Sequence, residues 1–496
     1  MVSGTASHVG KSVLVAALCR ILVNRGCKVA PFKSQNMSLN SWVTDNGDEI
    51  GIAQAVQAWA AKIQPSADMN PVLLKPKGDL ISQVILQGKP LGDRKVGEYY
   101  DATNAIFERV CESLKALARS YEVIVMEGAG SPAEINLYEQ DIANLRVARS
   151  ADAPVVLIGD IERGGVFASL YGTVQLLAEG DRKRVKGFIV NKFRGDKKLL
   201  DPGLRQLEEL TGIPVLGVIP YVNVRLPSED SVSLNDAVPA GPGVLDIVVI
   251  KLPHISNFTD FEPLEPFARV RYVALGDELG EPDAIIIPGT KNTVDDLREM
   301  RRYGMDKRVQ KRAGQVPIIG ICGGFQMLGE TIIDEGFEGT RNLSNVVEGL
   351  RLLEARTVFT SSKKRTKQVQ KRVTGAGPLL DRLRNEVVRG YEIHMGTTIS
   401  AHPIFDDDGG QDASGLVLGT YLHGLFHNDN FRSALLGFLQ AQHVQKHHRS
   451  RCSAVVESSW SERHMLAVHA MDPFEELAQV VLEHVDMEVL YSIIGL

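Results

Sequence analysis

Short apolar runs alternate with segments of helical period through the first half of the chain. The apolar runs predict strands at residues 28–32, 123–126, 154–158, 187–190 and 215–219. Between several of them the apolar residues follow a helical period, over residues 12–24, 52–63, 106–118 and 165–177. Strands that alternate with helices form a parallel sheet with helices on both faces. The pattern therefore predicts a doubly wound α/β domain over residues 1–225.

The same alternation resumes after a segment rich in Pro, Ser, Asp and Gly. That segment, residues 226–243, has the composition of a linker. Further apolar runs follow it at residues 246–250, 284–287, 316–319 and 416–421. They predict a second doubly wound α/β domain over residues 244–440.

Two later segments depart from this pattern. Residues 361–372 form a basic run, which we expect to be a solvated loop or an exposed helix face. Residues 441–496 are expected to be a tail that is partly helical, with a helix from about residue 475 to 491. His443, His447 and His448 suggest a metal site in this tail, but a solvated histidine cluster is the better interpretation without a carboxylate or cysteine nearby.

Composition narrows the class of protein. A chain of 496 residues has room for two to four domains, and its net charge of −6 without a long basic block argues against a nucleic-acid partner. The five cysteines are scattered and odd in number, which favours a reduced cytoplasmic protein over a disulfide framework or a zinc ribbon. The apolar runs are too short to span a membrane, and no signal peptide is expected. The oligomeric state stays open.

A phosphate-binding loop lies almost at the start of the chain. Residues 4–12 are Gly-Thr-Ala-Ser-His-Val-Gly-Lys-Ser, in which the first glycine stands one position earlier than in the strict motif. Backbone N–H groups around Gly10 would bind the phosphates of ATP, Lys11 would contribute charge to the β and γ phosphates, and Ser12 would bind Mg²⁺. Only three residues precede Gly4, so the first strand is short or the true start lies upstream.

A second motif lies between an apolar run and a helical segment. Residues 320–324 are Gly-Ile-Cys-Gly-Gly, the strand, turn and helix pattern of a nucleophile elbow with cysteine as the nucleophile. The glycines permit a sharp turn and leave N–H groups at the helix start free to bind an oxyanion. A small buried residue at a strand end is the alternative, but the flanking glycines favour Cys322 as a nucleophile.

The phosphate loop resembles that of dethiobiotin synthetase and the related ATPases of its fold. The resemblance implies that Glu127, in a Glu-Gly-Ala-Gly turn after a predicted strand, binds the metal ion. It also implies that Lys33 contacts the γ-phosphate and the substrate, and that Asn191 lies where relatives hold the nucleotide base. Switch-type ATPases of this fold have an extra lysine where this chain has Ala6, so the resemblance favours a metabolic enzyme.

The second half resembles the class I glutamine amidotransferases, whose glutaminase domain uses a Cys-His pair. The resemblance implies that Cys322 is the nucleophile and that His423 activates its thiol and later protonates ammonia. Gly289 and Gly323 would supply N–H groups to the oxyanion. The commoner form has a glutamate two residues after the histidine, where this chain has Leu425. Another group therefore orients His423, or the pair acts as a dyad.

The two domains in this order resemble the cobalamin-pathway amidotransferases, and the cobyric acid synthase family in particular. The segments that carry the closer resemblance are residues 31–41, 69–76, 131–137, 256–260 and 391–396. The resemblance extends to about residue 440. It implies amidation of the b, d, e and g carboxylates of adenosylcobyrinic acid a,c-diamide to give adenosylcobyric acid, with ATP, Mg²⁺ and glutamine.

The implied corrinoid substrate is large and carries several carboxylates. Candidates to meet those carboxylates are Lys33, Lys75, Asn36 and Asn40, although solvated polar loops explain the last three equally well.

Two alternatives remain. One is a synthase that makes the a,c-diamide itself, against which residues 35–37 (Gln-Asn-Met) and 70–71 (Asn-Pro) argue. The other is a nucleotide-switch binding protein with an inactive amidotransferase-like domain. Glutamine-stimulated ATP turnover that depends on a corrinoid would separate the switch protein from either enzyme.

Overall fold

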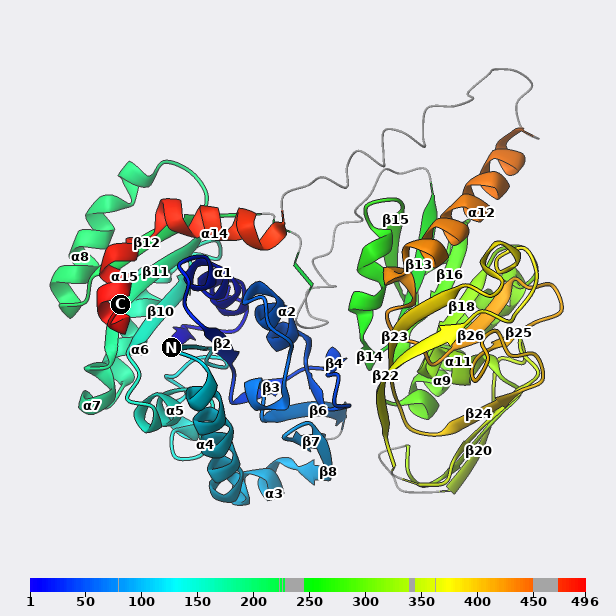
Figure 1. Cartoon of the computed structure of the whole chain (residues 1–496), viewed down its shortest axis with the longest axis horizontal. Coiled ribbons are helices and arrows are strands. Elements are labelled where there is room, and N and C mark those ends of the chain that lie inside the picture. Colours follow the sequence, from blue (N-terminus) through cyan, green and yellow to red (C-terminus); the bar gives the residue numbers. More distant parts are fainter. Residues whose placement is uncertain are drawn as a thin grey trace.

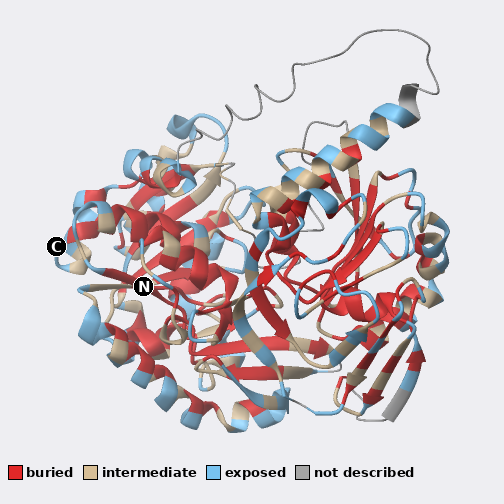
Figure 2. Cartoon of the chain, turned by 45° about the vertical axis from the view of Figure 1, so that its right-hand side comes forward, coloured by how far each residue is buried: buried red, intermediate tan, exposed pale blue. Residues whose placement is uncertain are grey.

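The computed structural model describes residues 1–78, 80–222, 224, 226–227, 245–338, 344–361, 363–448 and 472–496. Two α/β domains lie side by side (Figure 1), and buried residues fill the sheets of both (Figure 2). None of the helices in these ranges is long and apolar enough to cross a membrane.

The N-terminal domain is built on a parallel sheet with the strand order β2, β9, β1, β10, β11, β12, in which a bridge between Val2 and Glu127 joins the first two strands to the other four. The strands are β1 (Val2–Gly4), β2 (Val29–Phe32), β9 (Val123–Met126), β10 (Val155–Asp160), β11 (Val185–Phe193) and β12 (Val215–Pro220). All five strands expected in this half are confirmed to within a few residues. The phosphate loop begins at the end of β1, which has three residues.

Helices surround this sheet in the doubly wound arrangement (Figure 1). They are α1 (Lys11–Asn24), α2 (Ile52–Ala60), α3 (Val96–Asp101), α4 (Thr103–Ser120), α5 (Leu145–Ser150), α6 (Val166–Leu176), α7 (Glu179–Arg182) and α8 (Asp201–Thr211). Beside them lie a small sheet and a hairpin, formed by β3 (Gln35–Met37), β6 (Val72–Gly78), β7 (Ile81–Leu86) and β8 (Lys89–Lys95), and by β4 (Ser41–Val43) and β5 (Glu49–Gly51). The small sheet and the hairpin face the second domain.

The end of the chain returns to the N-terminal domain. Helices α14 (Pro473–His484) and α15 (Met487–Ile494) lie beside β12 and α1 (Figure 1). Leu477 and Val481 are buried in the same core as Leu216 of β12. The expected tail thus contributes helices to the packing of the first domain.

The C-terminal domain has a sheet with the order β15, β13, β16, β18, β26, β25, parallel except for the last strand. The strands are β13 (Asp246–Lys251), β15 (Arg269–Ala274), β16 (Ala284–Ile287), β18 (Ile318–Ile321), β25 (Gly410–Gln411) and β26 (Val417–Thr420). The helices are α9 (Thr293–Arg302), α10 (Met305–Arg312), α11 (Gly323–Leu328) and α12 (Asp429–His448). A doubly wound second domain is therefore also confirmed.

Smaller sheets complete this domain. β20 (Ser344–Glu348), β19 (Thr331–Glu335), β21 (Ala355–Phe359) and β24 (Thr397–Ser400) form one, and β22 (Arg365–Arg372) with β23 (Val387–His394) forms another. The third pairs β14 (Ile255–Ser256) with β17 (Gly289–Thr290).

The basic run at residues 361–372 is a correction to the sequence analysis. It contains β22 rather than a solvated loop or helix face. The side chain of Lys371 is only 1% exposed and binds Glu392 and Asp407 at 2.6 Å each, while that of Lys364 is 4% exposed and pairs with Glu49 of the N-terminal domain. Acidic partners distant in sequence let these lysines be buried.

His443 is a second correction. Its ring is half-buried and Nδ1 lies 3.0 Å from Asp283 Oδ1, so it is not part of a solvated cluster. The side chains of His447 and His448 lie outside the described residues. Within the described ranges, no group of three or more His, Cys, Asp or Glu side chains could hold a metal ion.

Candidate active sites

The phosphate loop connects β1 to α1 and is closed by Lys11. Its Nζ donates to the carbonyl oxygens of Ala6 at 2.8 Å and Gly130 at 3.1 Å, which places the ammonium over the loop. Gly10 has φ +101, and a Cβ there would lie 2.1 Å from Asn191 Nδ2. Glycine is required at this position both by its backbone and by the close approach of Asn191.

Asn191 lies near the end of β11, beside the loop. Its Nδ2 donates to the Val9 carbonyl at 2.9 Å. The next residue, Lys192, donates to His8 O and Asp160 Oδ2, both at 2.8 Å. Asn191 therefore fixes the backbone of the phosphate loop, while its contact with a nucleotide base stays a prediction.

Glu127 follows β9 and is the centre of a buried polar cluster, with only 1% of its surface exposed. Its Oε1 accepts hydrogen bonds from Ser12 Oγ and Lys33 Nζ, both at 2.8 Å, and its Oε2 accepts from Gln57 Nε2 at 2.5 Å. The structure brings together three of the residues expected at the ATP site, from α1, the end of β2 and the end of β9.

The glutaminase nucleophile stands on a strained turn between β18 and α11. Cys322 has φ 52 and ψ −109, a region that residues with a side chain rarely adopt. A Cβ at Gly320 would lie 2.7 Å from the Gly324 backbone, and one at Gly324 would lie 2.0 Å from the Ile287 carbonyl. The turn therefore depends on these glycines, as in a nucleophile elbow.

His423 is oriented by Asp260. Its Nδ1 lies 2.7 Å from Asp260 Oδ2, and Asp260 Oδ1 accepts from the Gly424 N–H at 2.9 Å. Burial alone would lower the pKa of His423, but Asp260 and the neighbouring Cys322 thiol raise it to about 10. Its Nε2 is buried and has no hydrogen-bond partner among the described residues, so this nitrogen is free to exchange a proton with the thiol.

Sequence reasoning left open what orients His423, and the answer is this carboxylate 163 positions earlier. Asp260 is the last residue of the segment 256–260, which contributes to the family resemblance. The presence of an aspartate in this segment is the signal in the sequence, and the structure adds that the aspartate is buried against His423.

The two glycines expected at the oxyanion lie close to this pair. A Cβ at Gly289 would lie 3.2 Å from His423 Cε1, and one at Gly323 would lie 3.1 Å from the Thr290 nitrogen. Gly289, Gly323 and His423 therefore surround one site at the ends of β17, β18 and β26.

Four residues expected to meet the corrinoid are buried and contact protein groups, and their contact with the corrinoid stays a prediction. Their partners are Glu127 for Lys33, Glu49 for Lys75, Gln54 for Asn36 and the Phe258 N–H for Asn40. For the last three, burial shows that the alternative of solvated loops is wrong. One of these partners, the Phe258 N–H, belongs to the C-terminal domain, and a linear sequence does not reveal such a contact.

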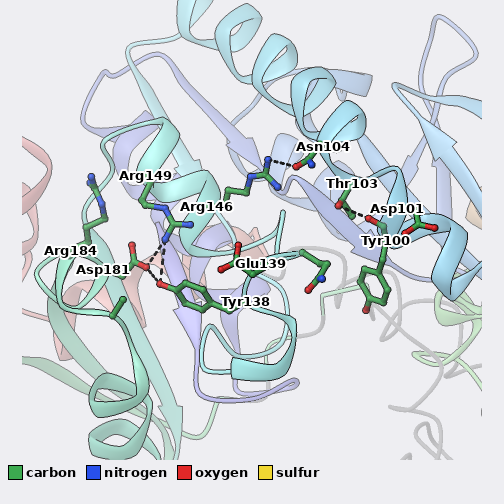
Figure 3. Close-up of a pocket in the computed structure, with 13 residues that line it drawn as sticks. Tyr100, Asp101, Thr103, Asn104, Tyr138, Glu139, Arg146, Arg149, Asp181 and Arg184 are labelled. Carbon is green, nitrogen blue, oxygen red and sulfur yellow. Dashed lines mark hydrogen bonds and ion pairs between the residues drawn. The ribbon is translucent and has the colours of Figure 1, made fainter.

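A wide polar groove of about 820 Å³ lies on the N-terminal domain (Figure 3). At one end Arg149 and Tyr138 point toward Asp181, with Arg149 at 2.5 Å from the carboxylate. Farther along the groove, between this end and Tyr100, Arg146 Nη2 donates to Asn104 Oδ1 at 2.9 Å. A smaller cavity shares Tyr138 with the groove and extends to Gly130 of the phosphate-loop site.

Two family models match the chain. Residues 1–233 match the CobQ/CobB/MinD/ParA nucleotide binding domain, and residues 246–431 match the CobB/CobQ-like glutamine amidotransferase domain. The first match covers the phosphate loop and Glu127, and the second covers Cys322 and His423.

Similar proteins match over their full length. The probable cobyric acid synthase of Methanococcoides burtonii is 56% identical over 100% of this chain and 97% of its own. That of Methanosarcina barkeri is 56% identical over 100% of this chain and 99% of its own, and that of Methanocella arvoryzae is 52% identical over 99% and 98%.

Proposed function

Because the chain belongs to the cobyric acid synthase family, we propose that it converts adenosylcobyrinic acid a,c-diamide into adenosylcobyric acid. The reaction forms four amides, at the b, d, e and g carboxylates, with nitrogen from glutamine and energy from ATP. The observation that carries this proposal is the presence of two separate sites in one chain: a phosphate loop beside Glu127, and Cys322 beside an oriented histidine.

The C-terminal site would release ammonia from glutamine. His423 takes the thiol proton at Nε2, which its raised pKa favours, and Cys322 Sγ then attacks the carboxamide carbon. His423 then donates a proton to the departing nitrogen, which leaves as ammonia. Water hydrolyses the thioester to glutamate and regenerates the thiol, while Asp260 holds His423 through Nδ1 during both transfers.

The N-terminal site would activate the corrinoid carboxylate. A carboxylate oxygen attacks the γ-phosphorus of ATP and ADP departs, which leaves an acyl phosphate that ammonia converts to an amide with release of phosphate. Lys11 would contact the β and γ phosphates, and Lys33, next to Glu127, would contribute charge at the transferred group.

Ser12 and Glu127 are the residues that would hold Mg²⁺. Their oxygens are 2.8 Å apart, and both are hard ligands of the kind that Mg²⁺ prefers. The ammonium of Lys33 at 2.8 Å from Glu127 shows that this site accommodates positive charge. When bound, the ion would neutralise charge on the β and γ phosphates of ATP.

The corrinoid would lie in the groove of Figure 3. Its volume of about 820 Å³ suits a large substrate, and Arg146 makes its hydrogen bond in the described structure to a neutral amide. An arginine whose hydrogen-bond acceptor is a neutral amide can exchange it for a carboxylate, which accepts two parallel hydrogen bonds. The smaller cavity toward Gly130 would admit one side-chain carboxylate to the phosphate loop.

Relatives named for cobyric acid synthesis, similar over the whole chain, argue against the alternatives. The strained Cys322 and its oriented histidine also argue against an inactive glutaminase.

Mass spectrometry of the product tests the proposal. The chain is incubated with ATP, Mg²⁺ and glutamine, and with either adenosylcobyrinic acid or its a,c-diamide. Four added amides on the a,c-diamide are expected. Two amides added only to the unamidated acid would favour the a,c-diamide synthase, and no amide on either would contradict both.

A further inference from the structure

A cavity beside Cys322 is lined by charged side chains from both domains. Gln326, Lys291 and Glu338 line it from the C-terminal domain, and Lys75 of β6 lines it from the N-terminal domain. The glutaminase steps proposed above act on the carboxamide and do not use these charges.

Lys291 follows β17, next to the oxyanion glycine. Its Nζ donates to Gln83 Oε1 of β7 at 2.9 Å, across the boundary between the domains. Within the described ranges Lys291 forms no ion pair within 4 Å, and the neighbouring Lys75 and Lys364 both pair with Glu49. Burial and the repulsion of Lys77 and Lys75 lower the pKa of Lys291 to about 8, so an anion beside it would be stabilising.

Glu338 lies on the same cavity and is 6% exposed. Its Oε1 accepts the backbone N–H of Thr293 at 2.8 Å, and Thr293 Oγ1 donates to Gln326 Oε1 at 2.9 Å. Burial raises the pKa of Glu338, although Lys291 opposes this. A cation beside Glu338 would therefore favour its ionised form.

We propose that Lys291 binds the α-carboxylate and Glu338 the α-ammonium group of the glutamine whose carboxamide reaches Cys322. An amino acid supplies opposite charges on one carbon, which matches a buried lysine and a buried glutamate on one cavity wall. His394 also lines the cavity, but burial lowers its pKa to about 4 and leaves it neutral. The inference rests on the glutaminase activity proposed above.

The N-terminal domain completes this subsite. Gln83 holds Lys291, and Glu49 binds the two other lysines on the cavity wall. Glutamine binding is consequently linked to the docking of the two domains.

Truncated substrates test the assignment of each charge. Glutaramic acid is glutamine without its α-amino group, and 4-aminobutanamide is glutamine without its α-carboxylate. Ammonia release from all three compounds is measured in the full-length protein and in the variants Lys291→Gln and Glu338→Gln. Lys311→Gln and Glu335→Gln, at exposed positions, are the matched controls.

The wild type and the controls should prefer glutamine to both truncated compounds. In Lys291→Gln the KM for glutamine should rise about tenfold or more, because a charge-assisted hydrogen bond is removed. This variant should no longer prefer glutamine to 4-aminobutanamide, but it should still prefer glutamine to glutaramic acid. Glu338→Gln should no longer prefer glutamine to glutaramic acid, but it should still prefer glutamine to 4-aminobutanamide. Alkylation of Cys322 by iodoacetamide, which has neither group, should keep its wild-type rate in a folded variant.

Retained preference in both variants, or equal loss against both compounds, would overturn the subsite. A wild type that releases no ammonia from glutamine would instead overturn the proposed glutaminase, so the two failures are distinguishable.

Discussion

The Tyr391 hydroxyl donates to the Ser41 carbonyl at 3.1 Å, across the boundary between the two domains. The Tyr391 ring also stacks on His423, with centroids 5.3 Å apart and an interplanar angle of 15°. Asn257 reinforces the link, because its Nδ2 donates to both Ser41 O and the Tyr391 hydroxyl. The glutaminase base therefore packs against a side chain that is hydrogen-bonded to the synthetase domain.

Tyr391→Phe removes this hydrogen bond and keeps the stacked ring. We expect glutamine-dependent amidation to fall about 3- to 10-fold, in line with the loss of one buried hydrogen bond, while amidation supplied with ammonium is unchanged. Steady-state rates with each nitrogen source measure the difference. An equal fall with both sources would show that Tyr391 supports the fold of the whole chain rather than the position of His423.

Asp260→Asn removes the carboxylate that raises the pKa of His423 to about 10. In the wild type, His423 can protonate the departing nitrogen until the pH approaches 10, so the alkaline limb of glutaminase activity should lie near that value. The variant should lose about 100-fold or more in kcat, with its alkaline limb shifted to lower pH. A pH–rate profile of ammonia release tests this prediction. An alkaline limb at the same pH in the variant as in the wild type would contradict the role assigned to Asp260.

The same pair affects stability. The pKa of His423 is raised above its ordinary value of 6.5, so the stabilisation by Asp260 is fully present below pH 6.5 and is lost as the pH rises through about 10. The difference in the free energy of unfolding between wild type and Asp260→Asn should therefore be larger at pH 6 than at pH 10.

The features predicted from sequence are those that short segments determine. Apolar runs predict β9 and β16 with the observed bounds, and the glycines around Cys322 predict its turn, because each depends on residues close in sequence. The expected strand at 316–319 lies at Ile318–Ile321 instead, a shift within one apolar run.

Features made by distant residues could not be predicted in this way. Asp260 meets His423 across 163 positions, and Lys364 meets Glu49 across 315. A basic run has no local property that distinguishes a solvated lysine from one with a buried acidic partner, so the burial of Lys364 follows only from the docked domains.

Glu127→Gln tests the metal site. A neutral amide is a weaker ligand for a hard cation, so the Mg²⁺ concentration for half-maximal turnover should rise about tenfold or more, with less effect on corrinoid affinity. The variant also leaves buried Lys33 without its carboxylate partner, which should reduce the free energy of unfolding by about 1.5–3 kcal/mol. Unchanged Mg²⁺ dependence in a folded variant would remove Glu127 from the site.

Arg146→Ala tests the groove as the corrinoid site. Loss of a bidentate contact with a carboxylate should raise the KM for the a,c-diamide about tenfold and leave the KM values for ATP and glutamine unchanged. Arg109→Ala, at an exposed position on α4 paired with Glu112, is a suitable control. Equal corrinoid KM values in the two variants would place the substrate elsewhere.

Cys322→Ser separates the two active sites. A serine hydroxyl ionises far less than a thiol, so formation of the ester intermediate should slow by several orders of magnitude, and glutamine-dependent amidation should be lost. The phosphate loop is unaffected by this change. Ammonium at high concentration and alkaline pH should therefore restore amidation in Cys322→Ser and in His423→Ala, since ammonia is the only intermediate that the C-terminal site supplies.

Lys11→Ala is the complementary variant, because it changes the ATP site instead of the glutaminase site. It removes the ammonium that closes the phosphate loop through Ala6 and Gly130, so activation of the carboxylate should fail with either nitrogen source. Amides are counted by mass in all three variants, first with glutamine and then with ammonium. A folded Cys322→Ser that ammonium does not rescue would mean that the cysteine also acts in the synthetase step, and a Lys11→Ala that amidates at near wild-type rate would contradict the ATP site.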